Sequence, residues 1–353
     1  MSESSKVPSK SETTAFIFFI TILYGRQNSF VFYYLQQYVA ISLMLSLIIV
    51  FIMDIEGDDR TMFEIKNSIL VSNVLDPLSK DTEDLKKVYE KLFKEGRYQS
   101  VETRPILDED LISYFNMIRD PQITTTYYVT GNLSRAGLSL SSQDDGKRLN
   151  AIAYCKEMLM QSAKTNVTYL GIASGVIEDN ALLNLDLFVD SLIELFNFVQ
   201  RNNLHIRFAI EPLDQYAHKK NVIGTLDMTL RMIKKLENKG YGINQFILTW
   251  DAAHVALNED AFEESIQKLS KYIYKVHFAN AILNKEDEMY GDYHLDFSKG
   301  FMNLACAKEI LSYCRKYIDH PIEVACEIRE KSKDHCWVLE EECYKFLMEA
   351  ELV

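Results

Sequence analysis

Residues 245–254 read QFILTWDAAH and join a short apolar run to two side chains that can bind a metal ion. The run has the composition of a β-strand and ends in Asp251, and His254 follows three residues later. Because a strand holds its last side chain rigidly, an acid and an imidazole at this point suit a divalent cation or an acid–base pair. The same pattern also fits an aspartate that caps a helix and an incidental histidine.

Three further strand-like runs of the chain end in an acid or a histidine. They are residues 208–211 (FAIE), 274–277 (YKVH) and 324–327 (VACE). Four such endings are harder to explain as coincidence than one, so together they favour a shared site.

The composition of the chain limits its size class and its partners. Its 353 residues are enough for one large domain or two average ones. An apolar fraction of 48% and a charged fraction of 25% are ordinary for a globular protein with a sizeable core. The net charge of -13 argues against binding to a phosphate backbone, for which a basic patch is typical. We therefore expect no nucleic-acid partner.

The six cysteines include no C-x-x-C pair and lie at positions 155, 306, 314, 326, 336 and 343. Several fall in apolar helix or strand patterns, which predicts small buried thiols of a reducing compartment rather than a disulfide framework. We therefore expect the globular part of the chain to be cytoplasmic.

The N-terminal residues differ in character from the rest. Residues 30–53 are apolar except for Gln36 and Gln37, and the run is long enough to cross a bilayer. Basic residues precede it and acidic residues follow it, so the positive-inside rule would place the rest of the chain outside, in conflict with free thiols. Residues 1–61 are therefore interpreted either as an extension with a single-pass membrane anchor or as a non-native start, with Met53 or Met62 as the true beginning.

From Met62 onward, strand-like runs alternate with amphipathic helical patterns. The predicted strands are residues 67–74, 98–104, 122–129, 167–173, 205–211, 245–251, 272–278 and 322–328. The predicted helices are residues 82–95, 108–118, 145–164, 184–202, 225–238, 259–270, 301–317 and 335–350. Eight strand–helix repeats predict a parallel sheet, and eight strands are the number that closes a (β/α)8 TIM barrel.

An open, doubly wound α/β sheet is the rival fold. Such a sheet normally carries a glycine-rich phosphate turn after its first strand. Residues 75–78 read LDPL at that place, so the turn is absent from the sequence. We therefore predict that residues 62–353 form one α/β domain, a (β/α)8 TIM barrel.

Active sites of such barrels lie at the C-terminal ends of the strands. The last four predicted strands deliver Glu211, Asp251, His277 and Glu327 to that end. Three carboxylates that converge there would repel one another, so a bound cation is the simplest explanation for their grouping. Their oxygen and nitrogen ligand atoms suit Mn2+, Mg2+, Co2+ or Zn2+.

A D-x-H pair follows the seventh predicted strand. Asp292 and His294 are spaced so that both can bind one ion, which His254 could share. An acid and a histidine in a polar loop are also common without any ligand, so both interpretations stay open.

Other polar residues near strand ends are candidates for substrate contact. Glu102 ends the second strand, and Asn132 and Arg135 follow the third. No basic cluster marks a strand end, so Arg135 and Arg329 are the only nearby candidates to bind a phosphate. Lys275 is expected to point away from the barrel interior.

Several short fragments stand in a familiar order and at strand ends. They are Glu211-Pro212-Leu213, Asp251-x-x-His254, residues 276–280 (VHFAN), residues 291–294 (GDYH) and Glu327. With these fragments, residues 62–353 resemble the xylose isomerase-like TIM-barrel superfamily. That superfamily includes sugar-phosphate isomerases and epimerases, ketose 3-epimerases and endonuclease IV.

The ketose 3-epimerase branch implies one divalent metal, Mn2+, Co2+ or Mg2+ with Zn2+ as an alternative, held by the four strand-end residues. It also implies that Glu211 and Glu327 act as acid and base on opposite faces of a sugar, through an enediolate. The implied substrate-binding residues are His254, Asn280, Asp292, His294 and Glu102. We therefore expect a sugar or sugar-phosphate isomerase or epimerase with a small carbohydrate substrate, assembled as a homo-oligomer.

The endonuclease IV branch implies a different site. There one zinc would be held by Asp251, His277, Glu327 and a bridging Glu211, and another by His254, Asp292 and His294. That family also uses histidines from the second and third strand regions, whereas all seven histidines here lie at position 205 or beyond. A DNA-repair nuclease is therefore the alternative function, and a barrel that binds a sugar or metal without catalysis is a further one.

Overall fold

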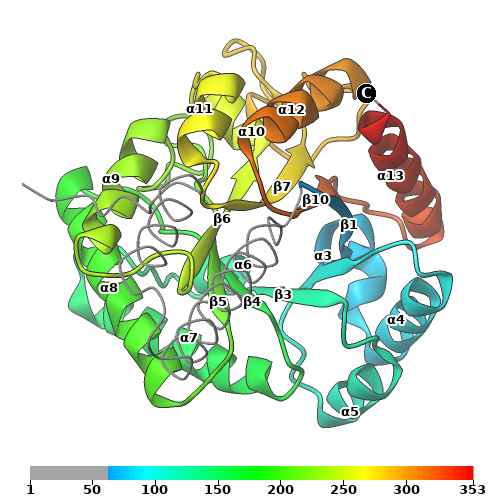
Figure 1. The fold of residues 1–353 in the computed structure, drawn as a ribbon, viewed down its shortest axis with the longest axis horizontal. Helices are drawn as coiled ribbons and strands as arrows, with labels where there is room; N and C mark the ends of the chain where they lie inside the picture. Colours follow the sequence, from blue (N-terminus) through cyan, green and yellow to red (C-terminus); the bar gives the residue numbers. More distant parts are fainter. Residues whose placement is uncertain (1–62, 353) are drawn as a thin grey trace, which may run out of the picture. The chain divides into compact units, whose positions relative to one another are not determined.

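The computed structural model describes residues 63–352, which form a closed barrel of eight parallel strands (Figure 1). Around the barrel the strands follow the order β1-β10-β7-β6-β5-β4-β3-β2. They are β1 (Ile65–Leu70), β2 (Ser100–Thr103), β3 (Thr124–Tyr128), β4 (Tyr169–Ile172), β5 (Arg207–Ile210), β6 (Phe246–Asp251), β7 (Ile273–Ala279) and β10 (Ile322–Glu327). The predicted (β/α)8 TIM barrel is confirmed.

Helices connect successive strands and surround the barrel (Figure 1). The longer ones are α4 (Thr82–Glu95), α5 (Glu109–Ile118), α7 (Asp145–Ala163), α8 (Ala181–Arg201), α9 (Leu226–Glu237), α11 (Phe262–Leu269), α12 (Leu304–Tyr317) and α13 (Cys336–Glu351). These eight correspond to the predicted helices. Shorter elements are α3 (Val71–Val74), α6 (Thr130–Arg135), α10 (Ala252–Leu257), the 3-10 helices Asp76–Lys80 and Lys333–His335, and the antiparallel pair β8 (Ala281–Ile282) and β9 (Gly291–Asp292).

Helix α4 shows how local sequence sets the limits of an element. The carboxylate of Asp81 accepts hydrogen bonds from the backbone N–H groups of Glu83 and Asp84 and so caps the first turn. Gly96 ends the helix in the left-handed conformation, at φ 64. The buried face consists of Leu85, Val88, Tyr89 and Leu92. Because these apolar residues are three or four positions apart, they lie on one face of the helix, and that face packs against the barrel.

The predicted N-terminal extension, residues 1–61 with the apolar run 30–53, lies outside the described residues. Among residues 63–352, no helix combines the length and the apolar character needed to cross a bilayer. The membrane anchor and the non-native start therefore both stay predictions.

The cysteines are free thiols. Five are buried, as predicted, and Cys306 is partly exposed. Burial raises the pKa of Cys155 and of Cys314 to about 12, so both thiols stay protonated at neutral pH. Five of the six thus behave as small apolar residues of the core.

Lys275 lies inside the barrel, which corrects the prediction that it points outward. Its side chain is fully buried, and its ammonium binds the carboxylate of Glu323 and lies 3.3 Å from Oε2 of Glu102. Side chains alternate along a strand, so residues 275 and 277 of β7 share one face. Because His277 faces the interior, Lys275 must do so as well, one layer below it.

Gly171 of β4 leaves room for the ring of Tyr128, the last residue of β3. A Cβ atom at position 171 would lie 2.3 Å from Cδ1 of that ring. Tyr128 is held by a hydrogen bond of 3.1 Å between its hydroxyl and that of Thr249, and its ring lies 6.0 Å from the ring of His277. The glycine therefore allows an aromatic side chain to lie beside the strand ends that carry the site.

Gly171→Ala is expected to lower the free energy of unfolding by about 1–3 kcal/mol, because the added methyl group displaces the partly buried ring of Tyr128. Urea unfolding followed by circular dichroism measures the change. Gly242→Ala is the matched control, since its Cβ would meet nothing closer than the Tyr272 hydroxyl at 3.7 Å. Equal stability of the two variants would show that Tyr128 moves aside without loss.

Candidate metal centre

The structure brings together the four residues predicted to hold a metal. One ligand atom from each of Glu211, Asp251, His277 and Glu327 lies within 4.8 Å of the others. Glu211 directly follows β5, Asp251 and Glu327 end β6 and β10, and His277 lies on β7. Four consecutive strands of the barrel thus contribute one ligand each, at the ends where parallel strands present their functional side chains.

His277 is oriented by a different partner on each ring nitrogen. Its Nδ1 lies 2.8 Å from Oε2 of Glu327 and 3.3 Å from Oε1 of Glu211. Its Nε2 lies 3.1 Å from Oε2 of Glu102, whose other oxygen, Oε1, accepts a hydrogen bond from the hydroxyl of Ser68. A proton on Nε2, donated to Glu102, leaves the lone pair of Nδ1 free to bind a cation between the carboxylates.

The two carboxylate oxygens of Asp251 have different roles, one at helix α10 and one in the four-residue cluster. Its Oδ1 accepts a hydrogen bond of 3.0 Å from the backbone N–H of His254 and so caps α10. Its Oδ2 is buried without a hydrogen-bond partner among the described residues. The helix-cap and metal-ligand interpretations of this aspartate are therefore compatible.

His254 lies beside the cluster and lines the cavity above it. Its Nδ1 lies 3.2 Å from the backbone nitrogen of Asp214 and 3.3 Å from Oδ2 of the same residue. Its Nε2 lies 3.8 Å from Oδ2 of Asp292. Burial lowers the pKa of His254, but the charge of Asp251 and the hydrogen bond to the carboxylate of Asp214 outweigh it and raise the value to about 10.

Asp292 and His294 also line the cavity. Asp292 forms an ion pair there with Lys219, a residue that the sequence pattern did not indicate. The ammonium of Lys219 lies 3.1 Å from Oδ2 of Asp292. Lys219 belongs to the polar loop after β5, and its neighbour His218 stacks on Tyr293 with ring centroids 4.5 Å apart. The sequence could have indicated Lys219 as a site residue through its position in a loop at the C-terminal face of the barrel, because such loops carry functional residues.

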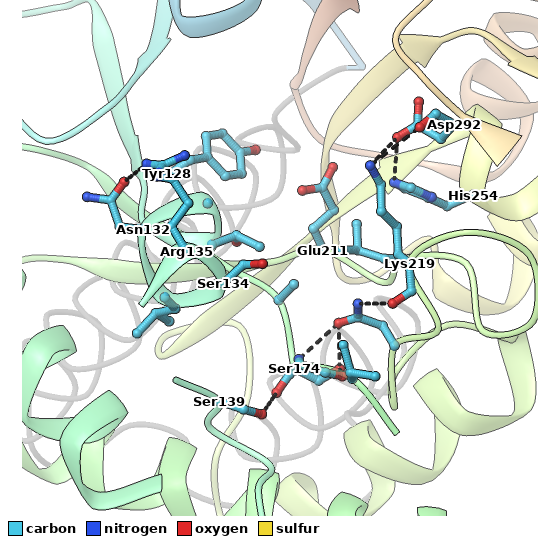
Figure 2. A pocket seen from close by; sticks show the side chains of 18 of the residues that line it. Tyr128, Asn132, Ser134, Arg135, Ser139, Ser174, Glu211, Lys219, His254 and Asp292 are labelled. Atoms are coloured by element: carbon cyan, nitrogen blue, oxygen red, sulfur yellow. Dashed lines mark hydrogen bonds and ion pairs between the residues drawn. The ribbon is translucent and has the colours of Figure 1, made fainter. Parts of the chain in front are cut away.

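A cavity of about 620 Å3 opens over the cluster and is lined by Glu211, His254, His277 and Glu327. Figure 2 shows Glu211 near its centre, with Lys219, His254 and Asp292 on one side and Tyr128, Asn132 and Arg135 on the other. The volume is in the range of sites for small organic ligands, about 300–1,000 Å3. The cluster is therefore accessible to a small molecule.

A sequence profile of the family described as xylose isomerase-like TIM barrel matches residues 98–334. The chain belongs to this family. Among curated proteins no sequence match is found.

Solved structures show the same xylose isomerase-like fold at low sequence identity. D-psicose 3-epimerase from Clostridium cellulolyticum H10, solved with D-tagatose, has a TM-score of 0.58 at 17% identity, over 82% of this chain and 99% of that one. The IOLI protein, solved with a zinc atom, has a TM-score of 0.58 at 15% identity, over 81% and 96%. An AP endonuclease of family 2 from Brucella melitensis has a TM-score of 0.54 at 13% identity, over 79% and 98%.

In this xylose isomerase-like barrel, the cluster has the chemistry of a cation site. Oε1 of Glu211 and Oδ2 of Asp251 are buried and accept no hydrogen bond from the described residues. Burial and the charge of Glu327 raise the pKa of Glu211, and burial with both glutamates raises that of Asp251 to about 8. A divalent cation would satisfy both oxygen atoms and remove the repulsion, so the residues present fit a metal.

Glu327 differs from the other two acids. Burial acts to raise its pKa, but His294 and His277 outweigh burial and lower the value to about 2. Its Oε1 also accepts a hydrogen bond of 3.0 Å from Nδ2 of Asn73. One carboxylate of the cluster is thus held in the charged form by its neighbours, whereas burial raises the pKa of Glu211.

Two residues that were predicted to contact substrate do not line the cavity. Glu102 is fully buried between Ser68, Lys275 and His277 and does not line the cavity, so it orients His277 instead. Asn280 is also fully buried; its Oδ1 accepts a hydrogen bond of 2.9 Å from the backbone N–H of Met302, and its amide donates to backbone oxygens of residues 296 and 299. Asn280 therefore stabilises the conformation of the loop after β9 through hydrogen bonds to its backbone.

Proposed function

We propose that this chain is a metal-dependent isomerase or epimerase of a sugar or sugar phosphate, which acts by proton transfer through an enediolate. The observation that supports this proposal is the convergence of one imidazole and three carboxylates, all within 4.8 Å, on the floor of the cavity. The solved structures with this fold include a D-psicose 3-epimerase and an L-ribulose 3-epimerase.

Glu211 and Glu327 are assigned to the proton transfer. They come from β5 and β10, line the cavity, and lie 3.3 Å and 2.8 Å from the same atom, Nδ1 of His277. One carboxylate would remove a proton from a carbon beside the carbonyl group, and the other would supply a proton from the opposite face. Return to the same carbon yields the epimer, and return to the neighbouring carbon yields the aldose–ketose isomer.

Glu211, Asp251, His277 and Glu327 would hold the cation, with Mn2+, Co2+ or Mg2+ expected and Zn2+ as the alternative. When bound, it would supply Lewis-acid stabilisation of the negative charge that develops on the carbonyl and hydroxyl oxygens of the sugar. His254 lines the cavity and can bind a substrate oxygen through Nε2. Asp292 and His294, on the same wall, are assigned to substrate hydroxyl groups.

The second ligand set expected of an endonuclease IV-like phosphoesterase does not form a comparable cluster. Among residues 63–352, the group around Glu211 is the one in which at least three metal-binding side chains place ligand atoms within 4.8 Å of one another. In the second set, Nε2 of His254 and Nδ1 of His294 lie 3.8 Å and 3.3 Å from different oxygen atoms of Asp292. At Asp292, the ammonium of Lys219 supplies a fixed positive charge 3.1 Å from the carboxylate. A site with one cation is therefore favoured over a multinuclear centre.

Titration of the metal-free protein with Mn2+ is expected to show one tight equivalent by calorimetry and to raise the midpoint of thermal unfolding. At 100 times the dissociation constant, binding to the folded state alone stabilises by about 2.7 kcal/mol. Asp251→Asn should lose most of this effect, because the amide can still cap α10 but carries no negative charge. The loaded enzyme should then exchange solvent deuterium into one member of a ketose panel.

Either of two results would contradict the proposal. One is failure to bind Mn2+, Co2+ or Mg2+. The other is a loaded protein that incorporates no deuterium into any ketose, aldose or sugar phosphate of the panel. Two or more tightly bound zinc ions would instead direct the search to phosphoester hydrolysis.

A further inference from the structure

The cavity wall is richer in positive charge than the chain as a whole. The chain has 38 basic and 51 acidic residues. The cavity is lined by Arg104, Arg135, Lys147, Lys219 and Arg329 and by Glu178, Glu211, Asp292 and Glu327. Two of the four acids belong to the proposed metal centre, so a bound cation would offset their charge.

The other charged side chains of the cavity wall are not all paired with one another. Lys219 is paired with Asp292, and Arg104 is paired with Asp76. Glu178 accepts hydrogen bonds of 2.6 Å from the Ser142 hydroxyl and from a backbone N–H, and no ion pair to it is formed. Two arginines of the wall, which we call the cavity arginines, are left without a carboxylate partner among residues 63–352. They are Arg135 and Arg329.

Arg135 is held in place by neutral acceptors. Its guanidinium donates a hydrogen bond of 2.6 Å to Oδ1 of Asn132 (Figure 2). The amide of Asn132 donates in turn to the hydroxyl of Tyr154 on α7, also at 2.6 Å. These contacts orient the exposed guanidinium at the cavity wall without neutralising its charge.

Arg329 is arranged in the same way at the metal end of the cavity. Its guanidinium lies 3.4 Å from Oδ1 of Asn73, and the amide of Asn73 donates to Glu327 at 3.0 Å. The backbone N–H of Arg329 donates to the carbonyl oxygen of His294 at 3.0 Å. A guanidinium is therefore linked through one asparagine to a proposed metal ligand, with its charge uncompensated.

We propose that the substrate of this site is an anionic sugar, whose phosphate or carboxylate group is bound by Arg135 and Arg329. This inference rests on the proposed function, because it names the substrate class of that same cavity. Guanidinium groups bind phosphate and carboxylate oxygens through paired, charge-assisted hydrogen bonds. An asparagine as the only fixed partner orients the arginine and leaves its remaining donors for the ligand.

The test compares neutral and anionic ligands by calorimetry on the Mn2+-loaded full chain. The probes are D-fructose, D-fructose 6-phosphate, D-fructuronate and inorganic phosphate. We expect at least one anionic sugar to bind about tenfold or more tightly than D-fructose, and increasing salt to weaken that preference. A preference for the phosphate or for the carboxylate sugar identifies which anion the cavity accepts.

Variants connect the preference to the two arginines. Arg135→Met and Arg329→Met should each reduce binding of the anionic sugar about tenfold while leaving D-fructose and Mn2+ affinities unchanged. Arg231→Met is the matched control, since Arg231 is exposed on α9 and paired with Asp227. Arg135→Gln and Arg329→Gln repeat the test with polar side chains.

Equal affinity for charged and neutral sugars would overturn the inference, as would a preference that persists in both variants. Mn2+ affinity, measured separately, reports on the proposed reaction. A protein that binds Mn2+ and D-fructose but shows no preference for anions would therefore keep the proposed function and lose the anionic substrate. If no metal binds, the response of inorganic phosphate binding to Arg135→Met and Arg329→Met still decides whether the arginines form an anion site.

Discussion

Glu327→Gln is expected to lower turnover of the substrate by about 100- to 10,000-fold, the range for loss of a general acid or base. The metal affinity should fall with it, because the amide carries no charge and Glu327 is one of the four clustered ligands. We expect a larger loss than the roughly 10- to 100-fold typical of outer partners of a metal site. Elemental analysis after dialysis measures the metal, and solvent-deuterium exchange measures the proton transfer.

The control for this change is Glu342→Gln, an exposed position on α13 that forms no ion pair with any other residue of 63–352. It makes the same chemical change far from the cluster and should retain metal and activity. If Glu327→Gln kept a full equivalent of metal and normal exchange, Glu327 would be neither a ligand nor an acid–base group. Loss of exchange with metal retained would assign Glu327 to the proton transfer alone.

Lys275→Met is expected to destabilise the protein by about 3–5 kcal/mol, the usual result of removing one partner from a buried ion pair. Two carboxylates, those of Glu102 and Glu323, depend on this ammonium in the barrel interior. Burial acts to lower the pKa of Lys275, but the charges of Glu102 and Glu323 outweigh it, so the lysine is charged. Urea unfolding measures the loss.

The same variant should weaken metal binding about 10- to 100-fold, because Glu102 orients His277 and depends on Lys275 for its charge balance. Calorimetric titration with Mn2+ measures this effect independently of stability. Lys234→Met, at an exposed position on α9, is the control for the loss of one positive charge. Unchanged stability and metal affinity in Lys275→Met would show that the barrel interior rearranges around the two glutamates.

The fold could be predicted from the sequence because its signals are local. Strand-like runs and helical periodicity are properties of neighbouring residues, and eight strand–helix repeats admit few closed arrangements. The grouping of the four strand-end residues followed from the same reasoning, since the register of parallel strands brings their ends to one edge. For Glu211, Asp251, His277 and Glu327 the topology alone was enough.

The sequence did not indicate which side chains meet across the barrel. Glu102 and Asn280 were expected to contact substrate, and Lys275 was expected to point outward, yet all three are fully buried. Their partners lie far away in sequence, such as Glu102 and Lys275 on strands β2 and β7, which are not neighbours in the sheet. No pattern along one strand reports such a contact.

By itself, the sequence determined the barrel, the order of its elements and the three acids and one imidazole at the ends of its last strands, because the periods of strands and helices are properties of adjacent residues. Only the tertiary structure decided which polar residues line the cavity and which lie behind them. The pairing of Lys219 with Asp292 and the uncompensated charges of Arg135 and Arg329 depend on distances between loops. Loop conformation follows from packing in three dimensions, and that packing is set by the whole barrel rather than by any one stretch of chain.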